Sequence, residues 1–180
     1  MSSNYLEIFS KINTFIFDVD GVMTDGRVLM MENGEAVRRM NIKDGYVLQL
    51  AVKLGYNIAI ITGGNSEAVK KRFNSLGIYD VYLKAADKMD VFEEYKLTHD
   101  IDPNKTLYMG DDIPDYQVMK EVAMPCCPTD AAEEIKQVSK YISSKKGGEG
   151  CVRDVMEKVL KLQNKWMDEK SAPAEANFKW

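Results

Sequence analysis

Histidine and cysteine are scarce in this sequence. His99 is the only histidine, and two of the three cysteines, Cys126 and Cys127, are adjacent. A single histidine excludes histidine-based catalysis and a histidine-rich metal site. Three cysteines without the paired spacing of a zinc site are expected to be buried, reduced thiols.

Long apolar runs and a surplus of positive charge are also missing. No run approaches the roughly 20 apolar residues that a membrane span needs, and the polar start of the chain lacks the layout of a secretion signal. The 24 basic and 28 acidic residues give a formal charge of −4 and form no basic stripe, which argues against nucleic acid as a partner. We therefore expect a soluble, cytoplasmic protein with no membrane or nucleic-acid partner.

Strand and helix patterns alternate along the chain, which predicts an α/β fold with a three-layer, Rossmann-like, mostly parallel sheet. Short β-branched and aromatic runs predict strands, and apolar residues three and four apart predict helices. The expected strands cover residues 14–19, 57–61, 79–83, 106–109 and 124–127, with a short one near 141; helices are expected over about 44–54, 66–76, 87–95, 115–122, from 130, and over 151–162. Asp44 is expected to cap the first of these helices.

Domain limits follow from the same pattern. Residues 1–164 are expected to form a single domain, and residues 165–180 lose periodicity and are expected to form a disordered tail. The segments 27–31 and 35–40 flank an Asn33-Gly34 pair, which is a strong tight-turn signal. A β-hairpin, called the flap below, is therefore predicted over about 26–41.

Three predicted strands end in polar residues suited to one site. Asp18 and Asp20 follow the first strand, Thr62 with Gly63 and Asn65 follows the second, and Asp111 with Asp112 follows the strand at 106–109. Because ligands of parallel sheets sit beyond the carboxyl ends of the strands, these side chains are expected to converge.

Clustered carboxylates with almost no histidine favour a hard, oxygen-liganded cation, and Mg²⁺ fits best. A carboxylate can also act as the nucleophile in phosphoryl transfer. Such a reaction needs a hydroxyl donor and a cation beside the carboxylates, and Thr62 and Lys88 fit these roles. Lys88 lies in the first turn of a predicted helix, which is an unfavourable place for a cation unless it has an anionic partner.

Four segments together resemble the motifs of the haloacid dehalogenase superfamily of phosphatases: Asp18-Val19-Asp20-Gly21 through Asp25, Thr62-Gly63, Lys88, and Gly110-Asp111-Asp112 with Asp115. Their spacing is close to that of the capless members that dephosphorylate 3-deoxy-D-manno-octulosonate 8-phosphate. The resemblance covers about residues 12–162 and implies a fold with a flap but no large cap domain.

The resemblance also implies roles for individual residues. Asp18 would be the nucleophile, Asp20 the general acid and base, and Thr62 and Lys88 would hold the phosphoryl oxygens. Mg²⁺ would be bound by Asp18, the backbone carbonyl of Asp20 and Asp111, with Asp112 or Asp115 in support.

Substrate and assembly are implied in the same way. The substrate would be a phosphorylated sugar acid in contact with Gly63, Asn65, Arg72 and Arg153, as well as with Thr62 and Lys88. The flap would pack with the flaps of other subunits in a homotetramer. Gly147 to Asp154 resembles the C-terminal stretch of the family, which reaches toward a neighbouring site. Gly64 stands where many members carry an arginine, so Arg72 and Arg153 are the candidates for binding the substrate carboxylate.

Three alternatives remain open. In the first, the substrate is a 9-phosphorylated nonulosonate, which is kept because Gly64 weakens the octulosonate assignment. The chain is a receiver-type phosphoacceptor module, although the Asp-x-Asp on the first strand and Lys88 ahead of the second acidic cluster favour a phosphatase. The chain is a catalytically silent scaffold, against which stands the retention of every catalytic position.

Overall fold

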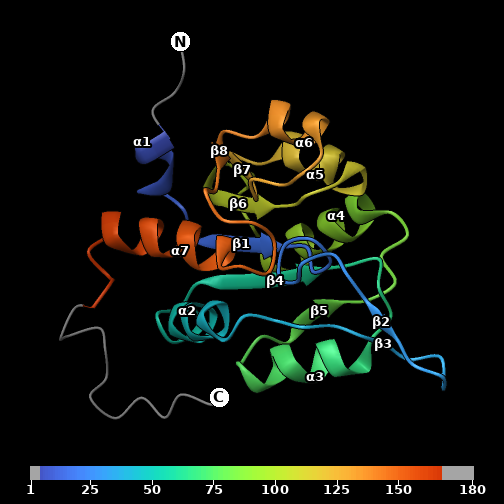
Figure 1. The fold of residues 1–180 in the computed structure, drawn as a ribbon. Coiled ribbons are helices and arrows are strands. Elements are labelled where there is room, and N and C mark those ends of the chain that lie inside the picture. The colour runs from blue at the N-terminus through green and yellow to red at the C-terminus, as the bar shows by residue number, and fades with distance from the viewer. Residues whose placement is uncertain (1–4, 168–180) are drawn as a thin grey trace.

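A six-stranded parallel sheet forms the centre of the computed structural model, which describes residues 5–167 (Figure 1). The strand order is β5 (Asp80–Tyr82), β4 (Asn57–Ile61), β1 (Thr14–Phe17), β6 (Thr106–Met109), β7 (Met124–Cys127) and β8 (Tyr141–Ile142). Every neighbouring pair is parallel, and β1 is bonded to both β4 and β6. The chain builds outward from β1 first on one side and then on the other, so the strand order reverses beside β1, where ligands of such sheets bind.

Helices cover both faces of the sheet. Alternate strand residues face opposite sides, so Phe15 and Phe17 join one apolar core and Ile16 joins the other. The first core contains residues of α1 (Tyr5–Phe9), α2 (Ile42–Lys53), α3 (Glu67–Ser75) and α7 (Cys151–Leu162). The second contains residues of α4 (Lys88–His99), α5 (Tyr116–Glu121) and α6 (Glu133–Val138). The three-layer fold predicted from the sequence is thus confirmed.

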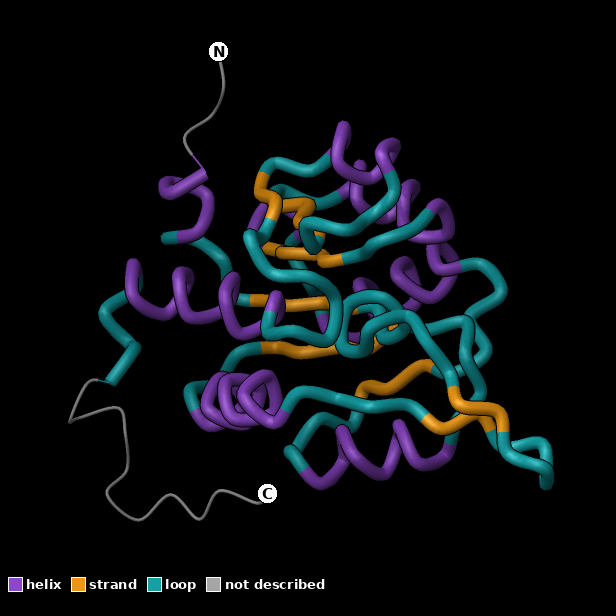
Figure 2. Tube along the Cα trace, viewed as in Figure 1, coloured by secondary structure: helices purple, strands orange, loops and turns teal. Residues whose placement is uncertain are grey.

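The flap follows β1 and projects from the body beside α3 (Figure 2). It is a two-stranded antiparallel ribbon of β2 (Leu29–Met30) and β3 (Ala36–Val37), shorter than predicted. Its turn is closed by a bond from the Met31 N–H to the Glu35 carbonyl, and Gly34 takes a φ of +87°, which glycine adopts without strain.

Several helix boundaries confirm their sequence signals. Ser66 caps α3, Asp87 caps α4, and α7 spans the predicted residues. The prediction that Asp44 caps α2 is wrong: Asn41 is the N-cap, and Asp44 is buried in the first turn of the helix, where its Oδ1 accepts a bond from the Arg153 N–H at 2.7 Å.

Other differences are smaller. The short helix α1 was not predicted, and α6 begins at Glu133 rather than near Asp130. Two 3₁₀ turns, Pro103–Lys105 and Ile113–Asp115, precede β6 and α5. Most of the predicted C-terminal tail lies outside the described residues. Within residues 5–167 the structure contains no helix with both the length and the apolar character that crossing a bilayer requires.

Candidate active site

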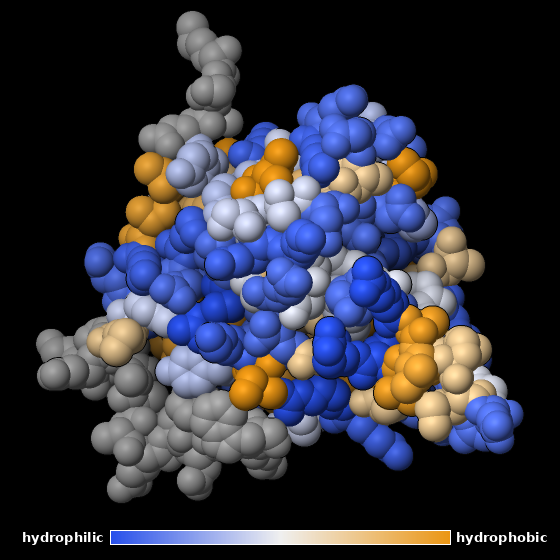
Figure 3. Space-filling view, viewed as in Figure 1, coloured by the Kyte–Doolittle hydropathy of each residue, from blue (hydrophilic) through white to orange (hydrophobic). Residues whose placement is uncertain are grey.

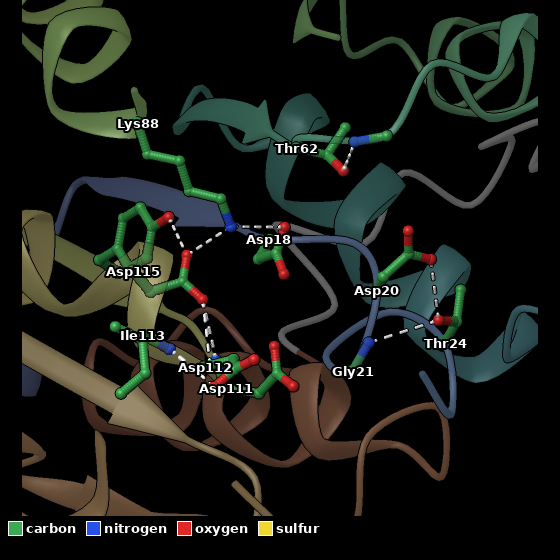
Figure 4. Close-up of polar contacts among 12 residues, drawn as sticks. Asp18, Asp20, Gly21, Thr24, Thr62, Lys88, Asp111, Asp112, Ile113 and Asp115 are labelled. Carbon is green, nitrogen blue, oxygen red and sulfur yellow. Dashed lines mark hydrogen bonds and ion pairs between the residues drawn. The ribbon is translucent and has the colours of Figure 1, made fainter. Parts of the chain in front are cut away.

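The strand ends beside β1 bring the predicted residues to one cavity of about 530 Å³. Asp18 and Asp20 follow β1, Thr62 and Gly63 follow β4, and Asp111 follows β6. Lys88, the first residue of α4, lines the same cavity and points toward Asp18 and Asp115 (Figure 4). The predicted convergence is therefore observed for these residues.

Lys88 lies between two carboxylates at the floor of the cavity. Its Nζ is 2.9 Å from Asp18 Oδ1 and 2.6 Å from Asp115 Oδ1, and all three side chains are almost fully buried. Burial alone would lower the pKa of Lys88, but the Asp18 and Asp115 carboxylates outweigh it and raise this pKa. The lysine is therefore a fixed cation beside Asp18, and it has the anionic partners that its place in the helix required.

Asp115 organises the other side of this pair. Its Oδ1 also accepts a 2.6 Å bond from the Tyr108 hydroxyl, and its Oδ2 accepts bonds from the N–H groups of Asp111 at 3.1 Å and Asp112 at 3.4 Å. Tyr108 was not predicted as a site residue; it lies in the middle of an apolar strand, and nothing in the sequence distinguishes it from core. Asp115 thus holds both Lys88 and the loop that carries Asp111.

Asp111 lies in an environment that disfavours its charge. Its Oδ1 is buried and has no hydrogen-bond partner among the described residues. Burial, followed by the nearby Asp18 and Asp115 carboxylates, raises the pKa of Asp111 to about 8, and burial with Asp115 raises the pKa of Asp18 to about 6. One carboxylate oxygen from each of Asp18, Asp111 and Asp115 lies within 4.8 Å of the others. Three carboxylate oxygens this close together, with Asp111 Oδ1 unpartnered, fit a divalent, oxygen-liganded metal.

Two glycines make room for these carboxylates. A Cβ on Gly21 would lie 1.9 Å from Asp111 Oδ2, and the φ of Gly21 is +97°. A Cβ on Gly110 would lie 2.4 Å from the Asp115 side chain. Gly21 is therefore required by the close approach of the loop after β1 to Asp111, and Gly110 by the way the loop after β6 folds back onto its own Asp115.

The C-terminal segment braces the loop after β1. The Gly148 N–H donates to the Val22 carbonyl at 3.0 Å, and a Cβ on Gly147 would lie 1.9 Å from the Gly21 carbonyl oxygen. The Thr24 hydroxyl accepts a 3.2 Å bond from the Gly26 N–H and donates to Asp20 Oδ1 at 3.4 Å. Within one chain, the stretch predicted to reach toward a neighbouring site thus packs on the chain's own first loop.

Thr62 stands across the cavity from Lys88. Its side chain is buried, and its Oγ1 accepts a 3.1 Å bond from the Gly64 N–H, so the hydroxyl hydrogen remains available for a ligand. Thr62 therefore both caps its turn and presents a donor to the cavity.

Arg38 of the flap, which the sequence did not single out, also reaches the site. Its guanidinium binds both carboxylate oxygens of Asp20, with Nε 2.7 Å from Oδ1 and Nη2 2.9 Å from Oδ2. The sequence signal is weak, since Arg38 is one of two adjacent arginines within the predicted hairpin segment 35–40.

The remaining predicted residues lie outside the acidic cavity. Asn65 and Arg72 line a neighbouring cavity of about 670 Å³ between the flap and α3. Arg153 does not line either cavity; its Nε is 2.8 Å from Glu157, and its guanidinium stacks over the Trp166 ring at 4.4 Å. Within its own chain, Arg153 therefore lies outside both cavities, and its contact with substrate stays a prediction.

Comparisons with known proteins identify relatives of this chain. A family model described as haloacid dehalogenase-like hydrolase matches residues 65–153. The 3-deoxy-D-manno-octulosonate 8-phosphate phosphatases of Yersinia pestis and Escherichia coli K12 are each 33% identical over 165 residues, or 92% of this chain and 88% of the relative. A crystal structure of the same phosphatase from Moraxella catarrhalis, in complex with magnesium, phosphate and KDO, aligns with a TM-score of 0.86 and 32% identity over 89% of this chain and 92% of that one.

Proposed function

Because this chain belongs to the 3-deoxy-D-manno-octulosonate 8-phosphate phosphatase family of haloacid dehalogenase-like hydrolases, and is thus a phosphoric monoester hydrolase, we propose that it dephosphorylates that sugar acid through an aspartyl-phosphate on Asp18. The observation that carries the proposal is the buried Lys88–Asp18 pair, with Asp20 and Thr62 around the same cavity. The Moraxella catarrhalis relative, whose complex holds magnesium, phosphate and KDO, supports the choice of substrate. Membership of a hydrolase family speaks against the receiver alternative.

Each site residue has a role in two chemical steps. In the first, an Asp18 carboxylate oxygen attacks phosphorus, the ester bond to the sugar oxygen breaks, and Asp20 gives that oxygen a proton. In the second, Asp20 takes a proton from water, which attacks phosphorus and releases phosphate and free Asp18. Lys88 and Thr62 bind the transferring phosphoryl oxygens, so that the charge of the group is balanced at fixed positions.

Magnesium would be held by Asp18, the Asp20 backbone carbonyl and Asp111. The unpartnered, buried Asp111 Oδ1 and the clustered carboxylate oxygens fit this ion. When bound, Mg²⁺ would neutralise charge on the phosphoryl group and on the carboxylates around it. Asp115, which is bonded to Lys88 and Tyr108, would support the Asp111 loop from behind.

The sugar acid would extend from the acidic cavity toward the cavity beneath the flap. That second cavity is lined by Gly34 to Arg38 of the flap and by Asn65 and Arg72, so it offers both an amide and a cation to a polyhydroxy acid. Arg72 would bind the substrate carboxylate, because the Arg153 side chain is occupied by Glu157 in its own chain.

Assembly as a homotetramer through the flaps completes the proposal. Exposed apolar side chains gather on the flap (Figure 3), and Leu29 and Met30 expose 65% and 64% of their surface. Neighbouring exposed apolar residues of that patch are Val28, Met31 and Val37. An apolar patch on a short two-stranded ribbon is typical of an interaction surface. Any substrate contact from Arg153 would then be made in a neighbouring subunit.

The test is a phosphate-release assay with Mg²⁺ on 3-deoxy-D-manno-octulosonate 8-phosphate, a 9-phosphorylated nonulosonate and a neutral sugar phosphate. We expect the highest kcat/KM on the octulosonate, and no turnover by Asp18→Asn. Asp100→Asn is a matched control, since Asp100 is exposed at the end of α4 opposite Lys88 and asparagine tolerates its left-handed backbone, so this variant should keep the wild-type rate. Preference for the nonulosonate would replace the substrate assignment, and full activity of Asp18→Asn would overturn the mechanism.

A further inference from the structure

Arg38 makes a forked ion pair with Asp20 that joins the flap to the acidic cavity. Besides the two bonds to Asp20, its Nη1 donates to the Ala36 carbonyl at 2.9 Å. The Arg38 side chain is only 13% exposed although it comes from a projecting hairpin. Burial by itself would lower the pKa of Arg38, but the hydrogen bonds to Asp20 raise it, so the guanidinium is a permanent cation at this position.

The fork is the main contact that fixes the Asp20 carboxylate. The other side-chain bond to Asp20 among the described residues is the 3.4 Å bond from Thr24. The Asp20 side chain is 34% exposed, so without Arg38 it has room to rotate away from the cavity. A carboxylate has about four lone-pair positions, and Arg38 and Thr24 occupy three of them, so one remains for a substrate oxygen or a proton.

Gly64 leaves the space that the Arg38 guanidinium fills. A Cβ on Gly64 would lie 3.2 Å from Arg38 Nη2 and 3.4 Å from Asp20 Oδ2. The first of these distances is closer than an ordinary contact, so a larger side chain at position 64 would push against the fork. The turn after β4 and the flap are therefore shaped to fit one guanidinium between them.

Arg38 also lies where the two cavities adjoin. It lines the 670 Å³ cavity beneath the flap, while its partner Asp20 lines the 530 Å³ acidic cavity. If a phosphate ester binds with its phosphate in the acidic cavity and its sugar beneath the flap, the ester bond lies beside Arg38 and Asp20. Asp20 is thus held at the place where the leaving oxygen of such an ester would lie.

We propose that Arg38 is a positioning residue: it holds the Asp20 carboxylate toward the leaving oxygen, so that protonation of the leaving group depends on the flap being in place. The inference rests on the proposed function of Asp20. In the step concerned, the bond between phosphorus and the leaving oxygen breaks, a bond between Asp18 and phosphorus forms, and the proton of Asp20 passes to the leaving oxygen.

A positioning role predicts a dependence on the leaving group. An alkoxide is a poor leaving group and needs the proton, whereas p-nitrophenolate leaves without one. General acid catalysis contributes about 10²–10⁴-fold, and a misplacement of about 1 Å can cost about 10²-fold. We expect Arg38→Gln to slow single-turnover release of the sugar alcohol by about 10–100-fold and release of p-nitrophenolate by about 3-fold or less.

The control is the neighbouring residue of the flap. The Arg39 side chain is 88% exposed, and its ion-pair partner within residues 5–167 is Asp25, at 3.4 Å, so Arg39→Gln removes the same charge from the same hairpin without touching Asp20. We expect Arg39→Gln to behave as the wild type with both esters. Arg38→Lys keeps the charge but loses the fork, and we expect it to recover part of the sugar-alcohol rate. Circular dichroism and the midpoint of thermal unfolding check that each variant is folded.

The outcomes separate this inference from the function on which it rests. Equal slowing of both esters by Arg38→Gln, a change in KM alone, or an equal effect of Arg39→Gln would overturn the positioning role while Asp18→Asn remained inactive. Turnover by Asp18→Asn would overturn the proposed function itself, whatever the Arg38 variants did. Selective slowing of the sugar ester, with partial recovery in Arg38→Lys, would support the proposal.

Discussion

Gly21→Ala should have two effects: a loss of unfolding free energy from the positive φ, and weaker metal binding because the Asp111 carboxylate is displaced. The φ of Gly21 is +97°, and the added Cβ would lie 1.9 Å from Asp111 Oδ2. Gly55→Ala is the matched control, because Gly55 has a φ of +81° and nothing within 4 Å of the added Cβ. Both variants should lose about 1–2 kcal/mol of unfolding free energy from the left-handed backbone alone. Only Gly21→Ala should also displace Asp111.

The displacement has a size that can be estimated. Ordinary contacts begin near 3.4 Å, so the Asp111 carboxylate must move by roughly 1 Å or more. Losing a well-placed group at a metal site typically weakens metal binding about 10–100-fold. At a Mg²⁺ concentration of about 100 times the wild-type Kd, the bound ion adds about 2.7 kcal/mol to stability. With a tenfold weaker site, the same concentration should add only about 1.4 kcal/mol.

The assay is thermal unfolding with and without Mg²⁺, together with the Mg²⁺ dependence of the phosphatase rate. For a chain of this size, 1 kcal/mol corresponds to about 2–4 °C in Tm. We expect wild type and Gly55→Ala to show the same Mg²⁺-induced rise in Tm, and Gly21→Ala about half of that rise or less. An equal rise in all three proteins would refute the assignment of Asp111 to the metal site.

Three further predictions concern charge and surface. Burial raises the pKa of Asp44 to about 6, above its ordinary value of 3.8, so its stabilising contribution is present below about pH 4 and is lost as the pH rises through about 6. In urea unfolding, the free energy of unfolding of Asp44→Asn should therefore rise relative to that of wild type by up to about 3 kcal/mol between pH 4 and 7. A difference between the two proteins that does not change with pH would contradict this. Lys88→Met leaves Asp18 and Asp115 buried without their cation, so the free energy of unfolding without Mg²⁺ should fall by about 3 kcal/mol, and added Mg²⁺ should restore part of it. An unchanged free energy of unfolding would argue against the buried network. Met30→Glu should dissociate the proposed tetramer, and light scattering should show the lower mass, whereas Glu32→Gln in the flap turn should leave the mass unchanged. An unaltered mass of Met30→Glu would contradict an interface formed by the flaps.

The sequence was sufficient for the sheet and for the residues at its strand ends. The strands at 57–61, 106–109 and 124–127 could be assigned because each is a short run bounded by polar or turn residues, and parallel strands then bring Asp18, Thr62 and Asp111 to one edge. In such patterns the residues that begin and end the strand are visible in the local sequence itself.

Long-range contacts left no comparable pattern. Asp44 looked like a helix cap, because an acidic residue before an apolar stripe usually is one, yet its partner is the Arg153 N–H, 109 residues away. The fork from Arg38 to Asp20 depends on the angle at which the flap folds back, and the bond from Tyr108 to Asp115 depends on the 3₁₀ turn after β6. Neither geometry follows from hydrophobic periodicity.

The contact between Gly147-Gly148 and the loop after β1 has a consequence for how an active molecule is made. A growing chain presents Asp18 and Asp20 early, but the backbone that braces their loop is synthesised more than 120 residues later, followed by α7. Domains of this kind settle only once their last packing elements have emerged from the ribosome. Catalytic competence should therefore arise only after residues 147–162 have been synthesised, and a chain stopped before residue 147 would carry every proposed catalytic side chain on a loop that is not held in place.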